Sequence, residues 1–194
     1  MPSPSADDLT PAEREALLDI AEAAILSGLD GHAPRPPVED VPQGLRRPGA
    51  AFVTVRVGGT LNGCIGTMEA RDPLSDVVAR MAWEAAFADP RLPALKREDL
   101  PALHIEISVL SAMEPVAAAT REQLQHEITP GVHGVLIESG RARATLLPAV
   151  WSQVREPDAF FDLLLRKAGL DPNLWPAGLR AFRYTASEFG RGPE

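Results

Sequence analysis

Apolar residues recur every three or four positions in three stretches of the chain, the spacing that places them on one face of a helix. The predicted helices extend from Thr10 to Gly28, from Asp72 to Asp89 and from Pro157 to Gly169, and a short helix is expected around Arg121 to His126. The first has the clearest start: Thr10 can cap it, Pro11 suits its first position and Glu13 follows three residues after the cap. We expect the second to lie across a sheet.

Alternation of apolar and polar residues predicts the strands. From Leu103 to Leu110, every second residue is apolar, while His104, Glu106 and Ser108 face the other way. Two hairpins are expected, over residues 51–66 and 132–147, because each has a glycine-containing turn at its centre. The segment from Leu179 to Phe189 is predicted to be a final strand and tail.

The register of the first hairpin decides which way its side chains face. If the loop consists of Gly58 and Gly59 alone, counting back from it pairs Val57 with Thr60, Val55 with Asn62 and Val53 with Cys64. Cys64 would then share a face with Val53 and Val55, which are apolar. The register thus predicts an apolar environment on one side of Cys64.

Hairpins and helices in this order predict an α+β fold, with a mainly antiparallel sheet flanked by helices. With 194 residues, of which 45% are hydrophobic, the chain can bury a substantial core in one domain or in two closely packed lobes. We expect residues 1–9 to be a disordered tail and residues 10–190 to be a single domain with two such lobes. Five prolines between Asp30 and Gly49 predict a long surface loop.

Charge and composition narrow the range of partners. A formal net charge of −8 opposes binding to phosphate backbones, so no nucleic-acid partner is expected. The single cysteine favours a reducing compartment, and neither a signal-peptide pattern nor an apolar run of roughly 20 residues is present, so we expect a cytoplasmic protein without a membrane partner. Spacings typical of metal sites, Walker loops and dinucleotide fingerprints are missing, so no metal and no cofactor is predicted.

The lone cysteine, Cys64, lies in the run from Leu61 to Gly66, between Gly63 and Ile65. One interpretation is a thiolate nucleophile in a pocket lined by Gly63 and Gly66, which would let a ligand approach closely. The other is a small buried residue packed on the neighbouring strand, with the glycines serving a bulge or tight packing. Both interpretations are open from the sequence.

This run resembles the signature Leu-Arg-Gly-Cys-Ile-Gly of the AmmeMemoRadiSam system protein A family, the AMMECR domain family. The resemblance extends from about Thr10 to Phe189, and it includes the segments Ala85–Arg91, His104–Ser111, Pro130–Gly134, Leu146–Pro148, Trp151 and Lys167–Leu170. It implies an α+β fold with a larger and a smaller lobe and the cysteine motif near their junction. It also implies a shared pathway with Memo-like and radical-SAM proteins. Asn62 stands where the family usually has Arg.

The residues proposed for catalysis are Cys64 as nucleophile, with Glu106 or His133 as base. The ligand-binding candidates are Asn62, Gly63, Ile65, Gly66 and Arg91. Three of these candidates also have a structural interpretation. Glu106 can be a solvent-facing strand position, His133 a turn residue, and Arg91 an ion-pair partner after a helix end.

Two functions follow from these candidates. The chain is expected to bind or process a small molecule or a modified group at the Gly-Cys-Ile-Gly motif, as a possible cysteine-dependent enzyme. The alternative is a binding or scaffold module for the Memo-like and radical-SAM partners, which recognises them without chemistry.

Overall fold

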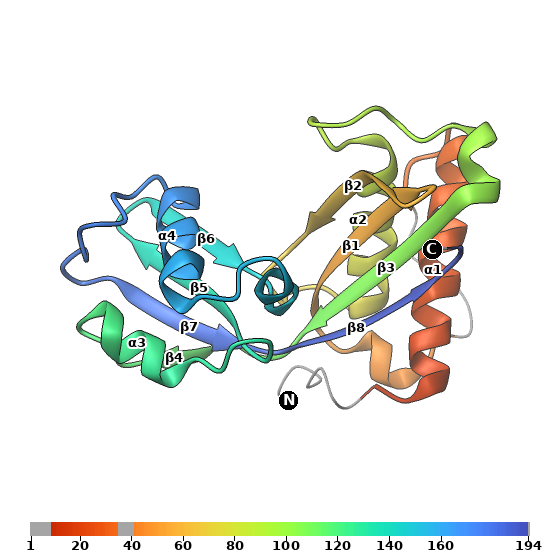
Figure 1. Cartoon of the computed structure of the whole chain (residues 1–194). Coiled ribbons are helices and arrows are strands. Elements are labelled where there is room, and N and C mark those ends of the chain that lie inside the picture. The colour runs from red at the N-terminus through yellow and green to blue at the C-terminus, as the bar shows by residue number, and fades with distance from the viewer. Residues whose placement is uncertain (1–8, 35–40, 194) are drawn as a thin grey trace. The chain divides into compact units, whose positions relative to one another are not determined.

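The computed structural model describes residues 9–34 and 41–193, and the chain divides into two compact units (Figure 1). The first unit contains the chain up to Ser111 together with the segment from Ser187 onward. The second unit extends from Ala112 to Ala186. The last part of the chain therefore returns to the first unit after completing the second.

The first unit has a four-stranded sheet in the order β2-β1-β3-β8. Its strands are β1 (Ala50–Val57), β2 (Thr60–Gly66), β3 (Leu103–Leu110) and β8 (Ala186–Arg191). Its helices are α1 (Pro11–Leu29) and α2 (Leu74–Phe87), with short 3-10 helices η2 (Gln43–Arg46) and η3 (Arg97–Ala102). Both α-helices share one apolar core with the sheet, so they cover the same face of it (Figure 1).

The start of α1 confirms the capping prediction. The Glu13 carboxylate accepts hydrogen bonds from the Thr10 N–H at 3.0 Å and from its hydroxyl at 2.9 Å, while the Glu13 N–H donates to the Thr10 hydroxyl oxygen at 3.2 Å. These bonds satisfy N–H groups that have no partner within the helix. The helix then buries Leu17, Ile25 and other apolar residues against the core.

The predicted register of the first hairpin is wrong beyond its turn. Val57 pairs with Thr60 as expected, but Val55 pairs with Gly63 and Thr54 pairs with Cys64. The reason is a β-bulge, in which Asn62 is an extra residue without a partner on β1. Since side chains alternate along a strand, this one extra residue moves Cys64 to the opposite face from Val53 and Val55.

The second unit has a four-stranded sheet in the order β4-β7-β5-β6. Its strands are β4 (Glu114–Val116), β5 (Gly134–Ser139), β6 (Ala142–Leu146) and β7 (Arg180–Tyr184). Its helices are α3 (Arg121–Glu127), the 3-10 helix η4 (Pro148–Ser152) and α4 (Pro157–Lys167), whose apolar residues form a second core with this sheet. In that core the rings of Trp151 and Phe160 stack with their centroids 3.7 Å apart.

The predicted α+β class is confirmed by these two antiparallel sheets and their helices. The second hairpin is confirmed, although it turns at Gly140 and Arg141 and not at the predicted Ser139 and Gly140, because Ser139 still pairs with Ala142. The single final strand is two strands, β7 and β8, which belong to different sheets. Of the tail predicted over residues 1–9, residues 1–8 lie outside the described part, and Leu9 is buried in the first core. Within residues 9–34 and 41–193, no helix has the length and apolar character needed to cross a bilayer.

Candidate functional site

Cys64 lies on the face of the first sheet that is opposite the helices. Its neighbours along β2, Gly63 and Ile65, pack toward α2 and the core, so the side chain between them faces the other way. Directly across on β1, the Thr54 hydroxyl donates a hydrogen bond to the Cys64 Sγ over 3.4 Å. The thiol is half-buried. The bulge thus places the sulfur beside a polar group instead of among the core valines.

The peptide of Cys64 is held on both sides by charged side chains from the segment after α2. Its N–H donates to the Asp89 carboxylate at 3.0 Å, and its carbonyl oxygen accepts from the Arg91 guanidinium at 2.9 Å. Arg91 also donates to Asp89 through Nε at 2.8 Å and Nη2 at 2.6 Å. Asp89, Arg91 and the Cys64 peptide therefore form a closed ring of hydrogen bonds, which we call the Cys64 clamp.

The two charged members of the Cys64 clamp differ in their surroundings. The Asp89 side chain is only 1% exposed, whereas the Arg91 side chain is 63% exposed. The bonds from Arg91 hold the pKa of the Asp89 carboxyl well below its usual value, helped by the N–H groups of Cys64 and Arg91 and opposed by burial. Asp89 in turn raises the pKa of Arg91. Asp89 is therefore a buried carboxylate that is ionised at neutral pH and bound to the Cys64 N–H.

The glycines of the motif serve close packing. A Cβ on Gly63 would lie 1.8 Å from the Ala85 carbonyl oxygen, so only glycine lets α2 approach β2 this closely. A Cβ on Gly66 would lie 2.2 Å from the Phe52 ring. Ile65 packs on the core, and the bulge residue Asn62 donates to the Pro93 carbonyl oxygen at 2.8 Å. Each of these four ligand-binding candidates thus has a partner within the protein.

Glu106 lies on the same face of the sheet as Cys64. It is directly opposite Thr54 in the pairing of β1 with β3, so Cys64, Thr54 and Glu106 form a row across three strands. Glu188 on β8 is close enough for the charge of Glu106, after burial, to raise the pKa of the Glu188 carboxyl. A bond to Ser108 opposes that shift. Two carboxylates thus lie toward the other end of the row.

His133 belongs to the second unit, where its ring stabilises a turn. Its Nδ1 accepts a hydrogen bond from the Thr129 N–H at 2.9 Å, and its carbonyl oxygen accepts from the Trp151 indole at 2.8 Å. Burial, together with the charge of Arg183, lowers the pKa of the His133 ring. The ring is therefore neutral at pH 7, with its lone pair engaged in the turn.

The structure brings Cys64, Glu106 and Arg91 into the same unit, and it gives all three a place on or beside one sheet. Sequence reasoning missed Thr54, Asp89 and Glu188. The first two escaped notice because a regular register put Thr54 on the other face and because Asp89 has the ordinary appearance of a helix stop. The signal for Asp89 was its position two residues before Arg91, in a segment that belongs to the family pattern.

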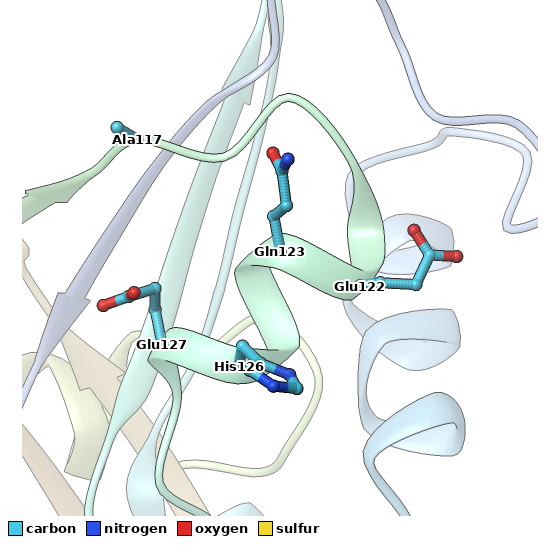
Figure 2. A pocket seen from close by; sticks show the side chains of 5 residues that line it. All are labelled: Ala117, Glu122, Gln123, His126 and Glu127. Carbon is cyan, nitrogen blue, oxygen red and sulfur yellow. The ribbon is translucent and has the colours of Figure 1, made fainter.

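A separate hollow of about 380 Å³ lies over α3 in the second unit (Figure 2). It is lined by Ala117, Glu122, Gln123, His126 and Glu127. None of the predicted site residues is among them. In the part of the chain that the structure describes, no three His, Cys, Asp or Glu side chains are grouped so that they could hold a metal ion.

Comparisons with known proteins agree with this architecture. A crystal structure of an uncharacterised protein from Pyrococcus horikoshii superposes with a TM-score of 0.87 at 30% identity, covering 95% of this chain and 96% of that one. Proteins of Methanothermobacter thermautotrophicus and Thermofilum pendens are 35% and 33% identical over 91% and 93% of this chain, and over 93% and 91% of their own lengths. The family model named AMMECR1 matches residues 18–189. The chain belongs to the AMMECR1 family.

Proposed function

We propose that this protein binds a small molecule across the Cys64 face of the first sheet, and that Cys64 reacts with it. The observation that supports this most is the row of Cys64, Thr54 and Glu106 on three adjacent strands. A nucleophile, a hydroxyl and a carboxylate pointing to the same side of a rigid sheet form an arrangement suited to a ligand that contacts all three. The Cys64 clamp adds a fixed position for the sulfur.

The spacing of the row indicates how the ligand would lie. Neighbouring strands are about 4.8 Å apart, so the backbones at Cys64 and Glu106 are separated by about 10 Å, with Thr54 between them. A carboxylate at that separation does not take the thiol proton directly. In our proposal, Cys64 releases its proton to water and the thiolate adds to a carbonyl carbon of the ligand. The electron pair of the C=O π bond moves onto the oxygen, which takes a proton from water, and Glu106 accepts a proton from the part of the ligand beyond Thr54.

His133 is the other base proposed from the sequence. To accept a proton at Nδ1, it would have to release the Thr129 N–H that it now binds. Glu106, in contrast, shares the sheet face with Cys64. We therefore propose Glu106 as the base, and we keep His133 as a test of that choice.

The pathway proposed for this site is the one shared with Memo-like and radical-SAM proteins. Membership of the AMMECR1 family supports it, and through the resemblance noted above it suggests that the ligand passes between these proteins. A binding or scaffold module would recognise a partner at the same face without chemistry and would not require a reactive thiol. The two functions therefore differ in what they require of Cys64.

Alkylation of the folded protein tests the proposal. Because Cys64 is the single cysteine, one adduct with iodoacetamide at pH 7.5, followed by intact mass, reports on it alone. We expect complete modification without denaturant, and no adduct in the Cys64→Ala control. Fractions of a cell extract that contain the ligand should slow the modification, and Glu106→Gln should weaken that protection.

The opposite results would favour the scaffold. A thiol that is modified only after unfolding would rule out a reacting Cys64. Co-purification of a Memo-like protein that survives Cys64→Ala, combined with an inert thiol, would make the binding module the better description.

A further inference from the structure

The Cys64 clamp acts at the edge of the first sheet. β2 is the outermost strand, so the peptide groups on its outer side have no neighbouring strand to bind. Water satisfies such groups in many proteins, and a neutral side chain can do so without burying a charge. At Cys64, however, the N–H donates a hydrogen bond to the Asp89 carboxylate, which is 1% exposed, and the carbonyl oxygen accepts one from the Arg91 guanidinium. Burying a charge costs free energy that covering an edge does not require.

A comparison within the same edge strengthens this point. Two residues before Cys64, the Asn62 amide joins β2 to the Pro93 carbonyl oxygen, which follows Asp89 and Arg91 in the same segment. At Asn62, then, the bond between this segment and β2 is neutral. At Cys64, the residue that carries the thiol, the bonds come from a charged pair.

We infer that Asp89 and Arg91 are positioning residues for Cys64, which fix its peptide and keep a guanidinium charge beside its sulfur. This inference rests on the proposed function, because positioning has a purpose only if the sulfur reacts. Arg91 donates to the Asp89 carboxylate through both Nε and Nη2, so its planar guanidinium is held in one orientation. In that orientation it also donates to the Cys64 carbonyl oxygen. Arg91 can then attract an anionic reagent or ligand group toward Cys64.

The electrostatic part of the inference depends on where the charge is held. The Arg91 guanidinium binds the Cys64 carbonyl oxygen at 2.9 Å, so its positive charge is fixed against the residue that carries the sulfur. Its bonds to the Asp89 carboxylate keep it there.

The test compares two alkylating reagents on Cys64 in the full-length protein. Iodoacetate is anionic and iodoacetamide is neutral, while both form the same S–C bond and release iodide. The variants are Arg91→Gln, Arg91→Lys, Asp89→Asn and the matched control Arg80→Gln, which removes the guanidinium of another Arg–Asp pair in the same unit. We expect Arg91→Gln to lower the ratio of iodoacetate to iodoacetamide rates about fivefold, a size typical of a partly screened charge. Arg91→Lys should restore part of that ratio.

Asp89→Asn separates positioning from edge protection by the direction of its effect. If the clamp positions the thiol, the Asn variant should react more slowly with iodoacetate, because Arg91 loses its anchor. If the clamp only protects the edge, the loosened strand should expose the thiol and both reagents should react faster. The amide of Cys64, observed alone after labelling with ¹⁵N-cysteine, should exchange faster in Asp89→Asn but not in Arg80→Gln.

The outcomes are distinct. An unchanged reagent ratio in Arg91→Gln, in a protein with a native spectrum, would overturn the inference even if Cys64 is reactive. A wild-type thiol that reacts with neither reagent would instead overturn the proposed function. If Asp89→Asn does not fold, the exposed Arg91 variants still decide the question, since they change a side chain that is 63% exposed.

Discussion

Cys64 and His133 each have a glycine as a chain neighbour, yet the protein uses them in opposite ways. At Cys64, other side chains hold the peptide, and among the described residues the sulfur is hydrogen-bonded only by the hydroxyl of Thr54. At His133, the ring itself holds the turn by accepting the Thr129 N–H. The comparison teaches that a candidate residue is best judged by whether its reactive atom already has a structural task.

The glycines beside these two residues, Gly63 and Gly134, are explained by packing and not by a shared function. A Cβ on Gly63 would meet the Ala85 carbonyl oxygen, and a Cβ on Gly134 would lie 2.5 Å from the Tyr184 ring. Both glycines therefore allow close packing. Their presence beside a candidate residue does not by itself indicate a ligand.

The largest effect is expected for Gly63→Ala. The new methyl group would lie 1.8 Å from the backbone of α2, which cannot rotate away, so helix and strand must separate. We expect the free energy of unfolding to fall by about 3 kcal/mol, at the upper end of the range for overpacked sites. Urea denaturation measures this value, with Cys64→Ala as a control on the same strand that should cost less than about 1 kcal/mol. Equal losses in both variants would contradict the close approach.

The second prediction concerns Asp89 and acid. A carboxyl whose folded pKa is lowered stabilises the protein above the unfolded pKa, near 3.8, and loses this contribution as the pH falls toward the folded pKa. Asp89→Asn should therefore be less stable than the wild type by about 2 kcal/mol at pH 7, the value of a few charge-assisted hydrogen bonds. Below pH 4 the difference should shrink, because the wild type is losing what the variant already lacks.

The control for this prediction is Asp72→Asn. Asp72 forms an ion pair with Arg80 at 3.0 Å, but both side chains are more than 40% exposed. Such a pair contributes about 0.5 kcal/mol or less, so the variant should follow the wild type at every pH. Urea midpoints between pH 2 and pH 7 for the three proteins give the comparison. If the difference in free energy of unfolding between Asp89→Asn and the wild type were the same at every pH, the clamp would not lower the pKa of Asp89.

His133→Ala should have a smaller effect, confined to the second unit. Losing the bond to Thr129 should cost about 1 kcal/mol. Since burial lowers the pKa of His133 in the folded protein, its neutral ring stabilises the fold fully above about pH 6.5, and this contribution falls as the pH drops below that value. The alanine variant should lack this part of the pH dependence, while Cys64 alkylation stays unchanged. A slowed alkylation would restore His133 as the base.

The features of this site that could be predicted from the sequence are those set by residues close together in the chain. The cap at Thr10 and the alternation of β3 are local, and both were predicted correctly. The face of Cys64 was not, because a bulge at Asn62 depends on how β2 fits against the segment that contains Pro93. Assigning the register by counting residues back from the turn cannot reveal such a bulge.

The clamp could not be predicted for a related reason. Asp89 is 25 positions after Cys64, and its default interpretation after a helix is a stop with a local ion pair. That ion pair does form, since Arg91 binds Asp89, so the prediction was correct as far as it went. What it lacked was the third member, the Cys64 peptide, which only the packing of α2 on β2 brings into reach.

The smallest effect tests the carboxylates that lie away from Cys64 on the same face. Burial raises the pKa of Glu188 first, and the charge of Glu106 raises it further. Glu106→Gln removes that charge but keeps the size of the side chain, so the pKa of Glu188 should fall toward its usual value. Carboxyl ¹³C shifts followed by NMR over a pH titration measure this change, and Glu114→Gln in the other unit is the control. An unchanged pKa of Glu188 would mean that the two carboxylates do not interact electrostatically. A ligand that spans the row would then contact Glu106 without an influence from Glu188.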